Sequence, residues 1–240
     1  MSTPVVHSQL GDQQVYEQDL HLLQPGEWLN DNIVAFFLEA LSLNKNTHYF
    51  LPPSVSSFLV HQLDPDDEDY GEECANFFRG AVPPVLNEDE NVDIDLLIPI
   101  NSSFSDPHAA FMQLGRGTHW SLLHVRICRS VTTTNLHHVH YDSCPRNSNL
   151  ATATSFRKTL NSSLIAAYGH ASIKSSTQMT PLTPFPSSGT MKQSDGWSCG
   201  WYCVFFARTI ILNAHESQPS YNHDELSELL SKLLSKYKIK

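Results

Sequence analysis

A cysteine lies where the character of the sequence changes. The segment QSDGWSCGWYCVFFAR, residues 193–208, begins with small polar residues and becomes almost wholly apolar after Cys199. The apolar part predicts a buried helix that starts at this cysteine. Unpaired backbone N–H groups and the positive end of the helix dipole stabilise a thiolate at such a position. Cys199 is therefore a candidate nucleophile, and the alternative is a small core residue.

A cysteine nucleophile needs a base, and the base needs a group that orients it. His119 opens the strand-like run HWSLLHVRIC, and Asp142 closes the next run, NLHHVHYDS. If these runs form a hairpin, both residues lie at one edge of the sheet. The carboxylate can then accept from one imidazole nitrogen while the other nitrogen faces the thiol. Each residue also has a structural alternative, because a histidine beside an apolar strand is often part of the core.

Gln193 lies ahead of Cys199 in the same polar segment. Its side-chain amide could donate to a developing oxyanion, with the backbone N–H of Cys199 as the second donor. The alternative is an ordinary loop glutamine.

The elements that must position these residues follow from periodicity and from turn residues. Asn30 and Asp31 are good caps for an apolar-periodic helix over residues 31–43. Further helices and strands are predicted from similar patterns. The predicted helices are 51–60, a short one ending near residue 80, 151–168, 199–215 and 224–237, and the predicted strands are 92–103, 119–128, 135–143 and 176–183. Helices that flank a small, mostly antiparallel sheet define an α+β domain.

Composition limits the classes of protein. A chain of 240 residues with 40% hydrophobic residues fits one domain, 1–240, in which we expect residues 1–12 to be flexible. No apolar run is long enough to span a membrane, and the start is not a signal peptide, so we expect the cytoplasm or the nucleus. Five cysteines, an odd number, argue against a disulfide framework. The net charge of −10 argues against nucleic acid as a partner.

Acidic residues are concentrated in one region. Between Asp64 and Asp95 lie twelve of the 25 acidic residues and a single base, Arg79. The segment 64–73 is interpreted as an acidic insertion. It is either a solvated loop and helix face or a patch that meets a basic protein.

Four short motifs occur in an order that resembles the Ulp/sentrin-specific cysteine protease family. They are WLND, THW, YDS and QSDGWSCG, and the resemblance extends from about Val15 to Ile211. It implies a papain-like, Ulp-type fold with the nucleophile at the N-terminus of a buried helix. It also implies that His119, Asp142, Gln193 and Cys199 are the catalytic residues.

The resemblance also implies a substrate site and shows one departure. Trp28 and Trp120 resemble the family's aromatic walls around a Gly-Gly tail, although each could be a core aromatic. Asp31 could contact the residues before the glycines, and helix capping is its alternative role. Ser198 stands where the family usually has aspartate.

Within the family, EWLND, GRGTHWSLL and YDSCPRNSN resemble the deneddylase branch. This implies a protease that cleaves after the Gly-Gly of the neddylation modifier, in precursor processing or on cullin-type conjugates. We expect a monomer without metal or cofactor. The enzymatic alternatives are a SUMO or ubiquitin protease and a Cys–His–Asp acyltransferase of related fold. A catalytically weak modifier-binding module is a further alternative. A metal protein that uses His137, His138, His140 and Cys144 is the last one, and no metal motif supports it.

Overall fold

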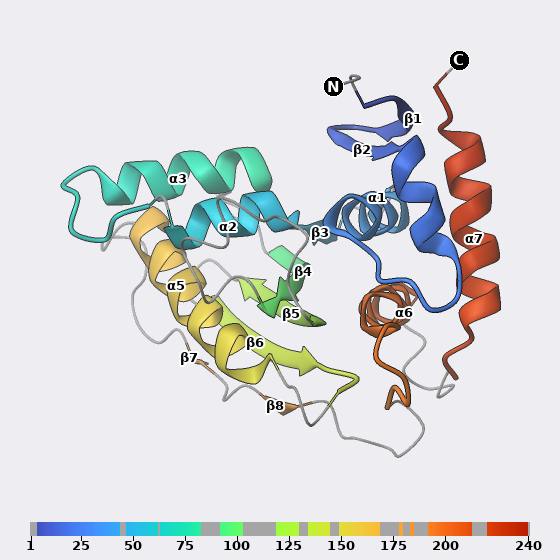
Figure 1. Cartoon of the computed structure of the whole chain (residues 1–240). Helices are drawn as coiled ribbons and strands as arrows, with labels where there is room; N and C mark the ends of the chain where they lie inside the picture. Colours follow the sequence, from blue (N-terminus) through green and yellow to red (C-terminus); the bar gives the residue numbers. More distant parts are fainter. Residues whose placement is uncertain are drawn as a thin grey trace.

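The fold is built on a mixed six-stranded sheet (Figure 1). The structure is a computed structural model, and it describes residues 4–43, 47–61, 63–82, 92–102, 119–129, 134–144, 149–168, 178–179, 183–184, 192–212 and 220–239. Three long antiparallel strands form the centre: β4 (Val92–Asn101), β5 (Trp120–Arg129) and β6 (Thr134–Tyr141). Short parallel strands flank them: β3 (His48–Phe50) pairs with β4, and β7 (Gln178–Met179) and β8 (Thr183–Pro184) pair with β6.

Both faces of the sheet are covered by helices. Because successive side chains of a strand point to opposite faces, β4 sends Leu96 and Ile98 into one core and Leu97 into the other. The first core lies under α2 (Pro53–His61), α3 (Tyr70–Ala81) and α5 (Leu150–Tyr168). The second lies under α1 (Asp31–Ser42), α6 (Cys199–Ile211) and α7 (His223–Lys236). Figure 1 shows the two groups of helices on opposite sides of the sheet.

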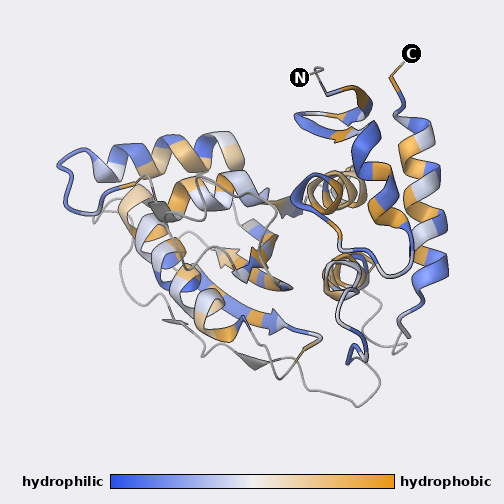
Figure 2. Cartoon of the chain, viewed as in Figure 1, coloured by the Kyte–Doolittle hydropathy of each residue, from blue (hydrophilic) through white to orange (hydrophobic). Residues whose placement is uncertain are grey.

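Helix α6 is the central element of the second core. All of its residues except Arg208 are buried, and Figure 2 shows it as mainly hydrophobic. An amphipathic helix would expose one face, so a helix that is apolar all round must be enclosed. Helix α1 packs beside it and begins where the Asn30 side chain accepts a hydrogen bond from the backbone N–H of Ile33 at 3.1 Å. Asn30 is therefore the N-cap, and Asp31 is the first residue of the helix.

The N-terminal segment, which the sequence predicts to be flexible over residues 1–12, contains a hairpin in the described residues. Residues 6–10 form strand β1 (Val6–Leu10), which pairs with β2 (Gln13–Tyr16), and residues 1–3 lie outside the described part. The hydroxyl of Ser8 donates to the carbonyl of Leu234 in α7 at 2.9 Å, and the N–H of Gln9 donates to the carbonyl of Tyr237 at 3.1 Å. The C-terminal helix and the residue after it therefore supply hydrogen-bond partners for this hairpin.

The acidic segment is a turn followed by a helix. Residues 64–69 form turns in which Asp64 and Asp67 accept backbone N–H groups two residues further on, each at 2.9 Å. Glu72 and Glu73 lie in the first turn of α3, where acidic residues complement the helix dipole. All seven acidic side chains of 64–73 are exposed, which fits both a solvated loop and helix face and a patch that meets a basic protein.

Most predicted elements occur within a few residues of their expected bounds, and the short ones were missed. The sequence analysis did not predict β1, β2, β3 or the 3-10 helix η1 (Glu17–Leu23), and it predicted one strand where β7 and β8 occur. Strands of three to five residues carry too little periodicity to be recognised. Among the described residues, no helix is both long and apolar enough to cross a membrane.

We predict that the protein loses stability in mild acid, because two of its histidines are buried. Burial lowers the pKa of both His138 and His140 to about 4, from 6.5 in a model peptide. Between pH 6.5 and 4 the unfolded chain therefore binds protons that the folded chain does not, and stability falls as the pH decreases. We expect roughly 2 kcal/mol less stability per histidine at pH 5 than at pH 7.5, measured as urea unfolding. His138→Gln and His140→Gln should each reduce this pH dependence.

Candidate active site

Cys199 is the first residue of α6, and its side chain is 1% exposed. The loop before it is held by the carboxylate of Asp195. One oxygen accepts the N–H groups of Trp197 and Ser198 at 2.9 and 2.8 Å, and the other accepts the hydroxyl of Ser198 at 2.9 Å. Ser198, the departure from the family pattern, is thus a donor to Asp195. These bonds fix the direction in which the chain enters the helix.

Gly200 follows the cysteine at a point of close packing. A Cβ atom on this residue would lie 3.0 Å from Cβ of Leu29 and 3.4 Å from Cδ1 of Trp120. Any side chain would therefore push the start of α6 away from these two residues. This contact explains why a glycine follows Cys199.

His119 and Asp142 meet at the edge of the sheet beside α6. His119 directly precedes β5 and Asp142 directly follows β6, and these two strands pair in antiparallel register. Nε2 of His119 therefore lies 2.7 Å from Oδ1 of Asp142. Asp142 also accepts the backbone N–H groups of Cys144 and Asn149, both at 2.9 Å. Although burial raises the pKa of Asp142, these hydrogen bonds and the charge of His119 lower it below its usual range. Asp142 is therefore ionised at neutral pH.

The histidine is poised to carry a positive charge. Burial lowers the pKa of His119, but hydrogen bonds to Asp142 and Cys199, and their charges, raise it to about 9. Since Nε2 is bound to Asp142, Nδ1 is the nitrogen that remains for the thiol. The structure thus brings Cys199, His119 and Asp142 together in a row. A protonated imidazole between a carboxylate and a thiol stabilises the thiolate.

Gln193 is held by its neighbours. The hydroxyl of Ser143 donates to its Oε1 at 2.6 Å, and its Nε2 donates to the carbonyl of Asp195 at 2.9 Å. An amide NH₂ has two N–H groups, so one remains for a further acceptor. The same residue, Asp195, therefore organises both the Cys199 loop and the amide.

The three residues predicted to bind the substrate lie in different environments. Trp28 is 39% exposed, so it is not a core aromatic. Trp120 is buried in the second core, and its Nε1 donates to the carbonyl of Leu29 at 3.0 Å. Asp31 is partly buried beside Asn30. Burial and the charge of Asp19 raise the pKa of Asp31 despite its backbone hydrogen bonds.

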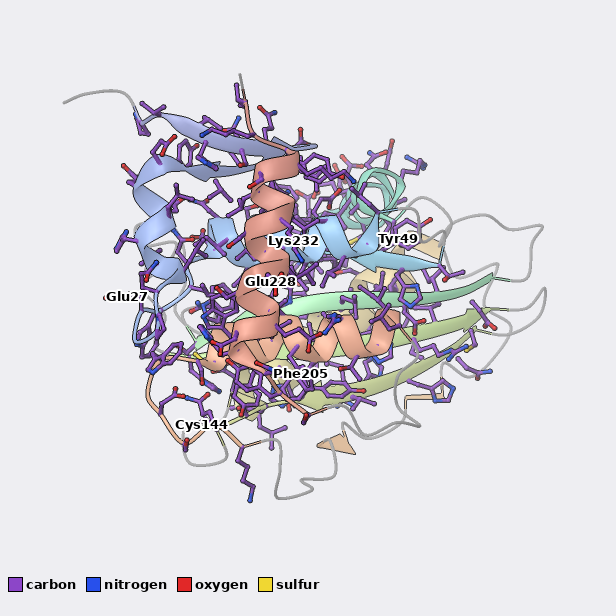
Figure 3. All side chains as sticks on the ribbon, turned by 90° about the vertical axis from the view of Figure 1, so that its right-hand side faces the viewer. Glu27, Tyr49, Cys144, Phe205, Glu228 and Lys232 are labelled. Atoms are coloured by element: carbon purple, nitrogen blue, oxygen red, sulfur yellow. The ribbon has the colours of Figure 1, made fainter. Side chains whose placement is uncertain are left out.

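The segment that carries Trp28 lies toward the end of the molecule at which α6 begins. Figure 3 shows Glu27, which precedes Trp28, on the same side of the view as Cys144, which follows Asp142 by two residues. The 3-10 helix η1 holds this segment, because the carboxylate of Asp19 accepts the side-chain amides of Asn30 and Asn32 at 2.8 and 3.1 Å. The sequence analysis missed Asp19.

Trp120→Ala is expected to impair both folding and turnover. The side chain is 2% exposed and contacts the start of α6, so its removal should cost about 3–5 kcal/mol of stability. It should also lower turnover per folded molecule, because Gly200 and Cys199 lose the surface on which they pack. Trp120→Phe keeps most of the packing and should lose much less of both. Urea unfolding and turnover of the same samples test this, and full turnover by folded Trp120→Ala would contradict it.

The alternative of a metal site receives no support from the histidines of β6. His138 hydrogen-bonds Oδ1 of Asn161 at 3.1 Å, and His140 hydrogen-bonds the hydroxyl of Ser121 at 2.9 Å. Within the described ranges, no three His, Cys, Asp or Glu side chains are grouped so that they could hold a metal ion.

A buried helix that presents a cysteine to a histidine–aspartate pair defines a thiol protease site. Comparison with known families agrees with this class. Residues 27–236 match the protein family described as "Ulp1 protease family, C-terminal catalytic domain". The chain belongs to the Ulp1 protease family and is a cysteine protease.

The individual relatives share only a low sequence identity with this chain. The "Probable sentrin-specific protease 8" of Dictyostelium discoideum is 25% identical over 258 residues, covering 98% of this chain and 90% of the relative. Among solved structures, the C-terminal Ulp1 protease domain in complex with SMT3, the yeast orthologue of SUMO, has a TM-score of 0.56 and 16% identity and covers 98% of this chain and 89% of that chain. The SUMO protease Ulp1 with its catalytic cysteine oxidised to a sulfinic acid has a TM-score of 0.58 and 15% identity, with 97% and 87% covered. The likeness to these structures is one of fold.

Proposed function

We propose that this protein cleaves the bond that follows the C-terminal Gly-Gly of a ubiquitin-like modifier, as an isopeptidase or a precursor-processing protease. The observation that carries the proposal is the row of Asp142, His119 and Cys199, with the pKa of His119 raised to about 9. Family membership supports the same class of reaction.

The reaction needs no group beyond the residues of this site. The Cys199 thiolate attacks the carbonyl carbon of the terminal glycine, and the oxyanion accepts from the Cys199 N–H and the Gln193 amide. The bond to the leaving amine breaks as His119 gives its proton to that nitrogen. Water then attacks the thioester and loses a proton to His119, which releases the modifier carboxylate and restores the thiolate. Asp142 keeps the imidazole oriented throughout.

The proposal includes selection for glycine by a narrow channel beside Cys199. The contacts of Gly200 with Leu29 and Trp120 bring the WLND segment directly against the start of α6. Only a residue without a side chain passes through a narrow channel between aromatic walls. In this proposal the exposed Trp28 covers the glycine tail, Trp120 forms the buried wall, and Asp31 contacts the residues before the glycines.

The modifier is proposed to be of the SUMO kind. The solved relatives that name a modifier are a SUMO protease and its complex with the yeast SUMO orthologue, which favours this choice. The neddylation modifier, with cullin-type conjugates, is the second candidate. It is favoured by the motifs EWLND, GRGTHWSLL and YDSCPRNSN.

The experiment is a panel of modifiers. SUMO, the neddylation modifier and ubiquitin, each with a C-terminal electrophile, are incubated with the protein and with Cys199→Ala. We expect rapid covalent labelling by SUMO at Cys199 and none in the variant. If the neddylation modifier labels Cys199 faster than SUMO does, the neddylation modifier becomes the proposed substrate instead of SUMO. Failure of every modifier to label, while iodoacetamide still alkylates Cys199, would overturn the proposed function.

The cellular compartment is also part of this proposal. The described cysteines, all five of the chain, are free thiols, as is usual for proteins in compartments that keep thiols reduced. We therefore place the activity in the cytoplasm or the nucleus, with the protein acting as a monomer.

A further inference from the structure

The position of His119 depends on how its backbone is held. The ladder between β4 and β5 ends at the pair Asn101 and Trp120, so His119 lies just beyond the last paired residue. A histidine outside the ladder could turn away from Asp142 unless another group fixes it. Two donors fix it: the carbonyl of His119 accepts the N–H of Ser102 at 3.1 Å and Nδ2 of Asn149 at 3.0 Å.

Asn149 contacts the ends of three strands. Its Nδ2 also donates to the carbonyl of Ile100 at the end of β4, at 3.1 Å, so both N–H groups of the amide are used. Its backbone N–H donates to Oδ2 of Asp142, just after β6, at 2.9 Å. One residue therefore binds the backbone of the proposed base and the side chain of the group that orients it.

Asn149 is itself anchored by a helix. Its carbonyl accepts the N–H of Ala153 at 2.8 Å, which makes it the residue before α5. Helix α5 packs on the sheet through Phe156, Leu160 and Leu164, all buried. Asn149 is 4% exposed, so water does not compete for its hydrogen bonds. The anchoring helix lies on the face of the sheet opposite to α6 (Figure 1).

We propose that Asn149 is a positioning residue of the active site, which holds His119 against Asp142 and so keeps Cys199 reactive. The inference rests on the proposed function. It does not require knowledge of the modifier, because the reactivity of the thiol is measurable without any substrate. Truncating the side chain frees the His119 carbonyl from α5 and leaves the carbonyl of Ile100 without this donor.

Helix α5 itself offers a matched control. Asn161 lies within α5, is a buried asparagine like Asn149 at 2% exposed, and hydrogen-bonds His138 rather than a residue of the candidate active site. Asn149→Ala and Asn161→Ala should both lose stability in urea, because each removes a buried hydrogen bond. Only Asn149→Ala should alter the active site.

The readout is the rate of alkylation of Cys199 by iodoacetamide from pH 5 to 10, with kcat on the modifier substrate measured per titrated active site. Asn149→Ala should alkylate at least about tenfold more slowly at neutral pH, and kcat should fall while KM changes little. The alkylation profile of Asn161→Ala should coincide with that of the unmodified protein. Asn149→Ser, which keeps one donor and a good residue before the helix, should recover part of the rate.

An alkylation profile of folded Asn149→Ala that coincides with the unmodified protein would overturn the proposal. Equal changes in Asn149→Ala and Asn161→Ala would also overturn it. If Asn149→Ala does not fold, Asn149→Ser decides: a profile unchanged from the unmodified protein overturns the proposal, and an intermediate rate supports it. An absence of cleavage with every modifier, with the alkylation result as expected, would remove the proposed function and leave the role of Asn149 in place.

Discussion

Cys199→Ala is expected to abolish cleavage of the modifier substrate while modifier binding persists. The methyl group cannot attack the glycine carbonyl, so turnover should fall by at least about 10⁴-fold, to the level left by the oxyanion donors and binding alone. Binding persists because the change removes one sulfur atom from a side chain that is already 1% exposed. Turnover with a fluorogenic modifier and titration calorimetry with the free modifier measure the two effects.

Cys203 provides the matched control for this experiment. It lies one turn further along α6, is equally buried, and its thiol donates to the carbonyl of Ser121 at 3.6 Å. Burial and nearby negative charges, including that of Cys199, raise the pKa of the Cys203 thiol, so this thiol is not a nucleophile at neutral pH. Cys203→Ala should lose some stability and keep its turnover per folded molecule. Cleavage by Cys199→Ala would contradict the assignment of the nucleophile.

His119→Ala is expected to lower kcat by about 10²–10⁴-fold, the usual range for loss of a positioned acid and base. Without the imidazole, no group protonates the leaving amine, and the thiolate loses the cation beside it. The rate of alkylation of Cys199 should fall at neutral pH and recover only in alkaline solution. In the unmodified protein, alkylation and turnover should stay high at neutral pH, and turnover should fall as the pH rises through about 9, where His119 loses its proton.

The ionisation of His119 also makes the stability of the fold depend on pH. The pKa of His119 is raised above the unfolded value of 6.5, so its contribution to stability is fully present below pH 6.5 and is lost as the pH rises through about 9. His119→Ala should therefore show a smaller loss of stability between pH 7 and 10 than the unmodified protein.

A second histidine–aspartate pair serves as the control for His119. Nε2 of His124 lies 2.7 Å from Oδ1 of Asp95, the same separation as in the pair of His119 and Asp142, and joins β5 to β4. His124→Ala should cost stability and leave the alkylation profile of Cys199 unchanged. If both variants alter the profile equally, His119 has no special relation to the thiol.

The sequence predicted where Cys199, His119 and Asp142 lie because each stands at the end of a long periodic pattern. The change from polar to apolar residues at Cys199 predicted a buried helix that starts there, and α6 begins at that residue. The alternation in the runs after His119 and before Asp142 predicted a hairpin, and β5 and β6 pair as antiparallel neighbours. Period-two and period-3.6 patterns extend over many residues, so they can be recognised without knowledge of the fold. The family was indicated separately, by the resemblance of four ordered motifs, and the match to the family over residues 27–236 confirms it.

Only the tertiary structure decided which groups support that chemistry. Asn149 reaches His119 and Ile100 from across the sheet edge, and Leu29 meets Gly200 and Trp120 from a separate segment. The N-terminal hairpin hydrogen-bonds the C-terminal helix, more than two hundred residues away in sequence. Such contacts join single residues whose separation in the chain has no period. They arise when helices pack on the sheet and bring unpaired carbonyls and amides together, and the need to satisfy those groups then selects the partners.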